Sequence, residues 1–306
     1  MEISSSSPAD KQDRSYERIS PTAWFVAYQR TLSDIPFSQE IFLELQETIE
    51  LTRSDETEDL KKQMKFFEGT PVWEARFKIV NHLLKTRSIN QIIEIAAGVS
   101  PRGLEMTKDS SVRYVEVDLP KVIQEKKGII ERLIAKSITP KRPNLHLEAG
   151  NALNPQDLLR ATRFFEEKPI AVINEGFLQY LGPEEVTIFA KNIHQLLSRF
   201  GGIWITPDIS TKTQDTKVLL SDEKVLERVQ RVIHITGVDV LKNRFENEDV
   251  AQAFFENLGF RVERHSSIEV IDELVTPQKL NLHREQIEKI AGLLTVFVMK
   301  INSSKP

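Results

Sequence analysis

Short apolar runs alternate with longer amphipathic stretches over the larger, C-terminal part of the chain. Runs of strand length lie at 92–96, 112–117, 143–147, 169–173 and 203–206. Most of their residues are apolar, as in strands that are buried on both faces of a parallel sheet. Stretches with helical spacing, such as 121–137, lie between them. This alternation predicts an α/β fold with a mostly parallel sheet.

Helical patterns dominate the region before the first of these runs. Ser20 and Pro21 suit a helix start, and apolar residues follow at helical spacing. Further helices are predicted at 38–51 and 72–85. They cannot belong to the strand and helix alternation, so we predict that 15–87 forms a helical cap over the cofactor side of the sheet.

Two further strands are expected near the C-terminus, at 260–264 and 293–300, the first of them after a helix that Gly259 ends. The polar stretches 210–248 and 268–282 are expected to be irregular insertions that contact substrate. Residues 1–14 are predicted to be a disordered lead-in. We therefore predict one domain over 15–301, with the α/β core at 88–301.

Composition narrows the classes of function. The 306 residues carry a formal net charge of −4, which gives no general attraction to nucleic acid or anionic lipid. Absence of cysteine excludes disulfides and thiolate metal sites. No apolar run is long enough to span a bilayer, and the first residues lack the apolar core of a signal peptide. We expect a cytoplasmic protein without nucleic-acid or membrane partners.

The stretch QIIEIAAGVSPRGLEMTKDSSVRYVEVD, residues 91–118, carries the strongest motif. A buried strand leads into small residues around Gly98, where a ligand can approach the backbone closely. The next strand ends in Asp118, whose carboxylate can accept hydrogen bonds from both hydroxyls of a ribose. A plain turn followed by a helix start is the alternative. The fingerprint G-x-G-x-x-G is absent because Ala96 stands at its first glycine, which disfavours a pyrophosphate-containing cofactor.

Two more acids follow apolar strands directly. Glu175 comes after the run 169–173, and Asp208 comes after 203–206. Open α/β sheets bind ligands at the carboxyl ends of their strands, so both acids are candidates for ligand contact.

The segments EIAAGVSPRG and RYVEVDLP make the chain recognisable. With AGNALNP, INEGFLQYLGPEEV and Glu74-Ala75-Arg76, this pattern resembles the leucine carboxyl methyltransferase-like branch of class I S-adenosylmethionine (SAM) methyltransferases, which includes polyketide O-methyltransferases. The resemblance begins near Trp73 and covers most of the rest of the chain. It implies a Rossmann-like sheet of about seven strands, the last antiparallel, and SAM as cofactor.

The resemblance also implies roles for individual residues. Arg76 matches the position that binds the terminal carboxylate of SAM, although residues alone would favour a surface arginine. Glu175 matches a glutamate near the ammonium group, and Asn151 a position that is often an aspartate contacting the adenine amino group. The predicted cofactor site comprises Arg76, Glu94, Ala96, Gly98, Asp118, Asn151, Ala152 and Glu175.

The sequence gives fewer signals for the residues that bind the methyl acceptor. Tyr16, Tyr28, Tyr180 and Asp208 are the substrate candidates. No histidine is paired with an acid at convincing spacing, so no general base is named, and no histidine cluster has metal-ligand spacing. The prediction is a SAM-dependent O-methyltransferase acting on a small molecule or a peptide carboxylate. A nucleotide-dependent oxidoreductase with a similar sheet and a non-catalytic SAM-binding module remain as alternatives.

Overall fold

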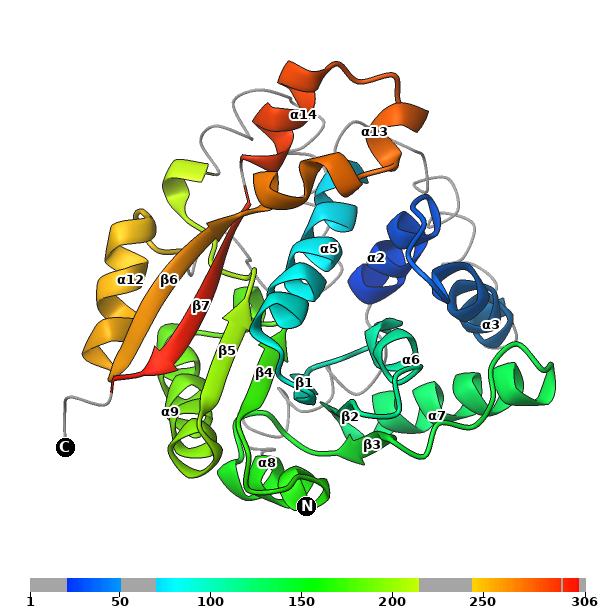
Figure 1. Ribbon diagram of the computed structural model, residues 1–306, viewed down its shortest axis with the longest axis horizontal. Coiled ribbons are helices and arrows are strands. Elements are labelled where there is room, and N and C mark those ends of the chain that lie inside the picture. Colours follow the sequence, from blue (N-terminus) through cyan, green and yellow to red (C-terminus); the bar gives the residue numbers. More distant parts are fainter. Residues whose placement is uncertain (1–20, 51–69, 215–243, 293, 303–306) are drawn as a thin grey trace, which may run out of the picture.

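The computed structural model describes residues 21–50, 70–214, 244–292 and 294–302. They form a seven-stranded sheet in the order β3-β2-β1-β4-β5-β7-β6 (Figure 1). The strands are β1 (Gln91–Ile95), β2 (Arg113–Asp118), β3 (Leu145–Ala149), β4 (Ile170–Asn174), β5 (Gly202–Thr206), β6 (Phe260–Ser266) and β7 (Thr295–Ile301).

Helices occupy both faces of the sheet and its carboxyl edge. The α-helices are α2 (Pro21–Thr31), α3 (Ser38–Glu50), α5 (Thr70–Arg87), α6 (Arg102–Met106), α7 (Pro120–Ala135), α8 (Pro155–Ala161), α9 (Pro183–Phe200), α12 (Glu248–Asn257), α13 (Thr276–Lys279) and α14 (Arg284–Ala291). Three 3₁₀ helices, η1 (Thr162–Phe164), η2 (Leu178–Tyr180) and η3 (Ser267–Glu273), complete the set in the described residues.

The strand directions confirm the predicted α/β class and the antiparallel last strand. β1 pairs in parallel with β2 on one side and with β4 on the other. β7 is antiparallel to both β5 and β6. Because the chain leaves β1 first toward β3 and later returns to β4, the sheet has its switch point between β1 and β4. Ligands of open α/β sheets bind at such a point, beyond the carboxyl ends of the strands.

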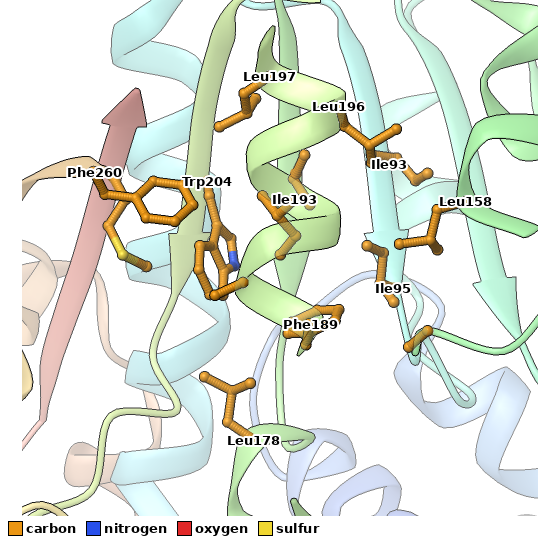
Figure 2. Packing of buried hydrophobic residues seen from close by; sticks show 14 of the residues in the cluster. Ile93, Ile95, Leu158, Leu178, Phe189, Ile193, Leu196, Leu197, Trp204 and Phe260 are labelled. Atoms are coloured by element: carbon orange, nitrogen blue, oxygen red, sulfur yellow. The ribbon is translucent and has the colours of Figure 1, made fainter. Parts of the chain in front are cut away.

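Side-chain alternation along β1 shows how the core is divided. Ile93 and Ile95 point to one face, where they join a cluster with residues of α8, α9 and α12. Figure 2 shows α9 lying over this face, with Ile193 and Leu196 directed at the strands. Trp204 of β5 is central there, with the rings of Phe189, Phe255 and Phe260 packed edge-on around it at centroid distances of 5.4 to 5.6 Å.

The opposite face is covered by α5, through a cluster that includes Ile79, Val80 and Leu83. This helix therefore serves as a layer of the α/β sandwich, whereas the sequence placed it in the helical cap. α2 and α3 do lie at the carboxyl edge, because their apolar residues pack on Val99 and Leu104 just after β1.

The segment 268–282 is not irregular as predicted. It forms most of η3 and all of α13, and it packs against α5 through Ala75, Ile271 and Leu274. The buried carboxylate of Glu74 accepts hydrogen bonds from the backbone N–H groups of residues 275 and 276 at 2.9 Å each, which fixes the start of α13. Of the other predicted insertion, 210–248, the part 215–243 lies outside the described residues. Its two ends meet in a bridge between Thr211 and Phe245.

Candidate functional site

Asp118 and the loop after β1 form the first part of the site. The loop turns with positive φ at Ala96 (56°) and Gly98 (50°). The Gly98 N–H donates to one carboxylate oxygen of Asp118 at 2.7 Å, and the Leu119 N–H donates to the other at 2.7 Å. Each oxygen keeps a second lone pair, so the carboxylate can still accept two hydroxyl groups. This geometry brings Gly98 and Asp118 together as the sequence predicted.

Glu175, at the exit of β4, is surrounded by three arginines. Its carboxylate lies 2.6 Å from Arg30 of α2, 2.7 Å from Arg102 of α6 and 3.8 Å from Arg76 of α5. Burial alone would raise the pKa of Glu175, but the charges of these arginines outweigh it and lower the pKa to about 2. The group is therefore ionised at neutral pH.

The ring of Phe77, on α5, stacks against two of these arginines. The guanidinium carbon of Arg102 lies 4.4 Å from its centroid, and that of Arg30 lies 5.2 Å away. Cation–π contacts of this kind are strongest where water is excluded, and Arg102 is fully buried. α5 thus positions the cationic cluster as well as covering the sheet.

Glu94, on β1, contacts the arginine cluster through Arg102. It is 2% exposed on the α5 face of β1, where one oxygen pairs with Arg102 and the other accepts from the Tyr114 hydroxyl at 2.8 Å. Arg102 also donates to Asn81 at 2.8 Å. Glu94 therefore supports the arginine cluster from below, and a direct contact with a cofactor stays a prediction.

Asp208 lies two residues after β5, and its side chain is 1% exposed. Its oxygens accept from Arg76, from Asn174 at 2.7 Å and from the backbone N–H groups of 176, 177 and 178. The sequence assigned Asp208 to substrate by position alone. In the structure the carboxylate is fully engaged within the protein, which leaves it no free face for a substrate.

The predicted adenine side lies at the exit of β3. The side-chain oxygen of Asn151 accepts from the Leu153 N–H at 2.9 Å, and the Asn151 N–H donates to Asp157 at 2.9 Å. Ala152 is 9% exposed and packs in the core under α9. Asn151 is exposed, so its amide is open to a ligand.

The aromatic substrate candidates are scattered. Tyr28 packs on Phe42, with ring centroids 5.5 Å apart, at the interface of α2 and α3. Tyr180 ends η2 and is half-buried. Tyr16 lies outside the described residues. Tyr28 and Tyr180 therefore belong to different elements, α2 and η2, and their contact with a substrate stays a prediction.

Two arginines of the cluster were missed from the sequence. Arg102 stands in the motif SPRG itself, but no role of its own was assigned to it from the sequence. Arg30 comes three residues after the buried Ala27, so it interrupts the apolar stripe of α2 with a charge. A charge at a core position is the signal that could have found it, because such a charge requires a buried partner.

Other features of the described chain do not compete with this site. A polar hollow of about 500 Å³ at the amino ends of β1 to β3 contains none of the predicted residues. Within the described residues, no group of three or more acids and histidines could hold a metal ion, and no helix is long and apolar enough to cross a membrane.

The low pKa of Glu175 predicts a specific acid sensitivity. Its folded-state pKa of about 2 lies below the ordinary 4.5, so its ionisation stabilises the fold above about pH 4.5 and this contribution is lost as the pH falls toward 2. We expect the difference in free energy of unfolding between the wild type and Glu175→Gln to shrink when urea unfolding is measured at pH 6, 4.5 and 3.5. A difference that stays constant over this range would contradict the assignment.

Comparison with known proteins identifies the family of this chain. Residues 36–194 match the family described as leucine carboxyl methyltransferase. No curated protein matches the sequence.

Among solved structures, a DUF574 family protein from Streptomyces avermitilis is similar with 15% identity, over 90% of this chain and 97% of that one, with a TM-score of 0.49. The methyltransferase domain of a bacterial CtHen1 has 17% identity over 75% of this chain and 98% of its own, with a TM-score of 0.46. Human N-acetylserotonin methyltransferase in complex with SAM has 10% identity over 78% of this chain and 57% of its own, with a TM-score of 0.42.

The family match covers more than half of the 306 residues. The chain therefore belongs to the leucine carboxyl methyltransferase family, a family of SAM-dependent methyltransferases.

Proposed function

We propose that this methyltransferase transfers the methyl group of SAM to an oxygen atom, on a small molecule or on a peptide carboxylate. The family description names a carboxyl group as the methyl acceptor, and that supports oxygen as the target. The observation that carries the proposal is the pairing of a free carboxylate face on Asp118 with an arginine cluster around Glu175, across the switch point of the sheet.

The residues present fit SAM in their donor and acceptor chemistry. Arg30 and Arg76 are 7% and 9% exposed, and the Nε–H of each has no hydrogen-bond partner in the described part of the chain. A buried guanidinium with an unused donor is suited to a ligand carboxylate. Asp118 supplies acceptors for ribose hydroxyls, and ionised Glu175 supplies an acceptor for an ammonium group.

These fits define the proposed roles. Arg76, together with Arg30, holds the terminal carboxylate of SAM. Glu175 holds the ammonium group, and Arg102 holds the Glu175 carboxylate in place. Asp118 and the Gly98 loop hold the ribose. Asn151 and Ala152 border the adenine, where the Asn151 amide is exposed and can receive the amino group.

SAM, when bound, supplies a methyl group already activated by the sulfonium charge. The chain therefore has to hold donor and acceptor in line and exclude water from between them. A carboxylate acceptor needs no general base, whereas a hydroxyl acceptor must lose a proton. Among the described histidines, His265 lies at the β6 edge beside Glu269 and Arg87, and His194 packs on Phe260. Neither contacts the arginine cluster around Glu175, so we assign neither histidine the role of general base.

A non-catalytic SAM-binding module is the second candidate function, since Asn151 replaces an acid that relatives often carry. Incubation of the purified protein with tritiated SAM and a cell extract separates the two. We expect a labelled product whose label is released by mild alkali, as a methyl ester would be. An alkali-stable product would point to a hydroxyl or nitrogen acceptor, and SAM binding without any labelled product would favour the non-catalytic module.

Cofactor binding itself predicts stabilisation of the fold. SAM or its demethylated product at a hundredfold excess over its dissociation constant should raise the free energy of unfolding by about 2.7 kcal/mol. A thermal shift assay with either compound measures this, and ATP serves as a control nucleotide that should have little effect. Absence of a shift in folded protein would contradict the cofactor site.

Two arginine variants test the proposed carboxylate contact. Arg76→Ala should weaken SAM binding by about tenfold, the lower end of the range for hydrogen bonds to charged groups, because Arg30 remains. Arg30→Ala should act in the same direction. Decarboxylated SAM, which lacks the carboxylate, should bind the variants and the wild type almost equally.

Isothermal titration of both ligands provides the measurement. Arg87→Ala is the matched control, since Arg87 ends the same helix but pairs with Glu263 away from the cluster. Equal losses for SAM and decarboxylated SAM in Arg76→Ala would mean that Arg76 has another partner.

A further inference from the structure

We infer that Asp208 is a positioning residue, which holds Arg76 and the β4 exit loop in the arrangement that receives the methionine end of SAM. The inference rests on the proposed site and assigns a role to a residue that touches no cofactor atom itself.

The Asp208 carboxylate accepts hydrogen bonds from α5, from the end of β4 and from the loop that follows β4. One oxygen accepts from the Gly176 N–H at 2.7 Å and from Arg76 of α5. The other accepts from the N–H groups of 177 and 178 at 2.8 and 3.2 Å, and from Asn174 at 2.7 Å. A carboxylate offers about four lone-pair sites, so five donors saturate it. Asp208 is thus bound too completely to bind a substrate.

Three of these donors are successive backbone N–H groups directly after Glu175. The chain turns there with a φ of 80° at Gly176, which directs the N–H groups toward one point. Such a concave set of N–H groups favours an anion. Asp208 provides that anion from within the chain, so the loop bearing Glu175 is closed before any ligand arrives.

A rigid support lies behind Asp208. Asn174 donates to it and accepts from the Trp204 Nε1–H at 2.7 Å, and Trp204 is fully buried under α9 (Figure 2). The Asp208 N–H also bonds the Thr206 hydroxyl at 3.2 Å. The carboxylate therefore has little freedom to move. Arg76 binds it through Nη2, while its Nε–H makes no hydrogen bond within the described residues and lies 3.8 Å from Glu175.

The charge of Asp208 has a second consequence for Arg76. Without it, the guanidinium has Glu175 as its remaining carboxylate partner, 3.8 Å away. Arg76 would then pair with Glu175 and be less available to a ligand carboxylate. Asp208 competes with Glu175 for Arg76, and in the structure it holds the closer contact with the guanidinium.

Discrimination between SAM and decarboxylated SAM tests the role. The wild type should bind SAM more tightly, with a ratio of dissociation constants that Arg76→Ala abolishes. Asp208→Asn should weaken SAM binding by about tenfold, leave decarboxylated SAM nearly unchanged, and so reduce the ratio to that of Arg76→Ala. In the double variant the ratio should fall no further, because both changes remove one function.

Glu74→Gln is the matched control. Glu74 is a buried carboxylate on the same helix as Arg76 and also accepts two backbone N–H groups, but it anchors α13 instead. Glu74→Gln should lower the melting temperature without changing the ratio of the dissociation constants of SAM and decarboxylated SAM. If Asp208→Asn fails to fold, Asp208→Glu keeps the charge but displaces it by one methylene group, and the same fall in ratio is expected.

The outcomes separate the inference from the proposed site. Equal weakening of both ligands, or tighter SAM binding in Asp208→Asn, would overturn the positioning role while the wild-type ratio still supports the site. A wild type that binds SAM without preference over decarboxylated SAM would overturn the proposed carboxylate contact, and the inference with it.

Discussion

Arg102→Met should destabilise the fold by about 3–5 kcal/mol, the range found when one partner of a buried ion pair is removed. Arg102 is fully buried and pairs with both Glu94 and Glu175. Methionine fills much of the same volume but leaves Glu94 with only the Tyr114 hydroxyl as a partner on that side. A buried carboxylate without a compensating charge is the dominant cost. Urea unfolding of the ligand-free protein measures the loss.

A second substitution separates charge from packing. Arg102→Met combined with Glu94→Gln should recover part of the lost stability, because the unpaired charge is then removed as well. Arg199→Met is the control, since Arg199 pairs with Glu167 at the surface, where both side chains are more than half exposed. Its unfolding midpoint should not change measurably. A loss in Arg102→Met no larger than in this control would show that the cluster contributes little to stability.

The central strands of the sheet, such as β1 and β4, were predictable because they are buried on both faces. Runs such as 169–173 have few polar residues, so their assignment as strands followed from composition and spacing. Their order in the sheet comes from the structure. Glu94 shows the limit of such runs. It stands between isoleucines in β1, and the alternation of side chains turns it toward Arg102 while Ile93 and Ile95 face α9. The strand pattern located Glu94. Its pairing with Arg102 could not be predicted, because it depends on the packing of α6.

Segments whose stability comes from distant partners were predicted less well. The stretch 268–282 has polar residues and a proline, which favour an irregular loop. Its helices depend instead on Glu74, about 200 residues earlier in the chain, and on apolar contacts with α5. The sequence pattern of 268–282 cannot reveal that the Glu74 carboxylate caps α13, because Glu74 lies in a distant part of the chain.

The candidate site shows the same division. Gly98 and Asp118 lie on one unit of β1, α6 and β2, so their proximity followed from the sequence. Glu175 was found by its place after β4, but its contact with Arg30 joins residues 145 positions apart. Asp208 was also found by its place after β5, but the sequence did not reveal its partners, because these include backbone N–H groups of the loop after β4.

Asp118→Ala should weaken SAM binding by about 1.5–3 kcal/mol, the range for hydrogen bonds to a charged group, or about 10- to 150-fold. The variant removes the acceptors proposed for the ribose and also frees the Gly98 and Leu119 N–H groups. Isothermal titration with SAM measures the total loss. Asp109→Ala is the control, because Asp109 precedes the same strand and also accepts a backbone N–H, from Ser111, at the opposite end of the sheet.

An analogue of SAM without the two ribose hydroxyls separates the two effects of Asp118→Ala. If Asp118 acts on the ribose, the variant should bind this analogue nearly as well as the wild type does, since the contact is absent in both. If the carboxylate serves only to hold the Gly98 loop, SAM and the analogue should lose affinity equally. The first outcome is expected, because each Asp118 oxygen accepts one N–H and retains a second lone pair that can accept a hydroxyl group.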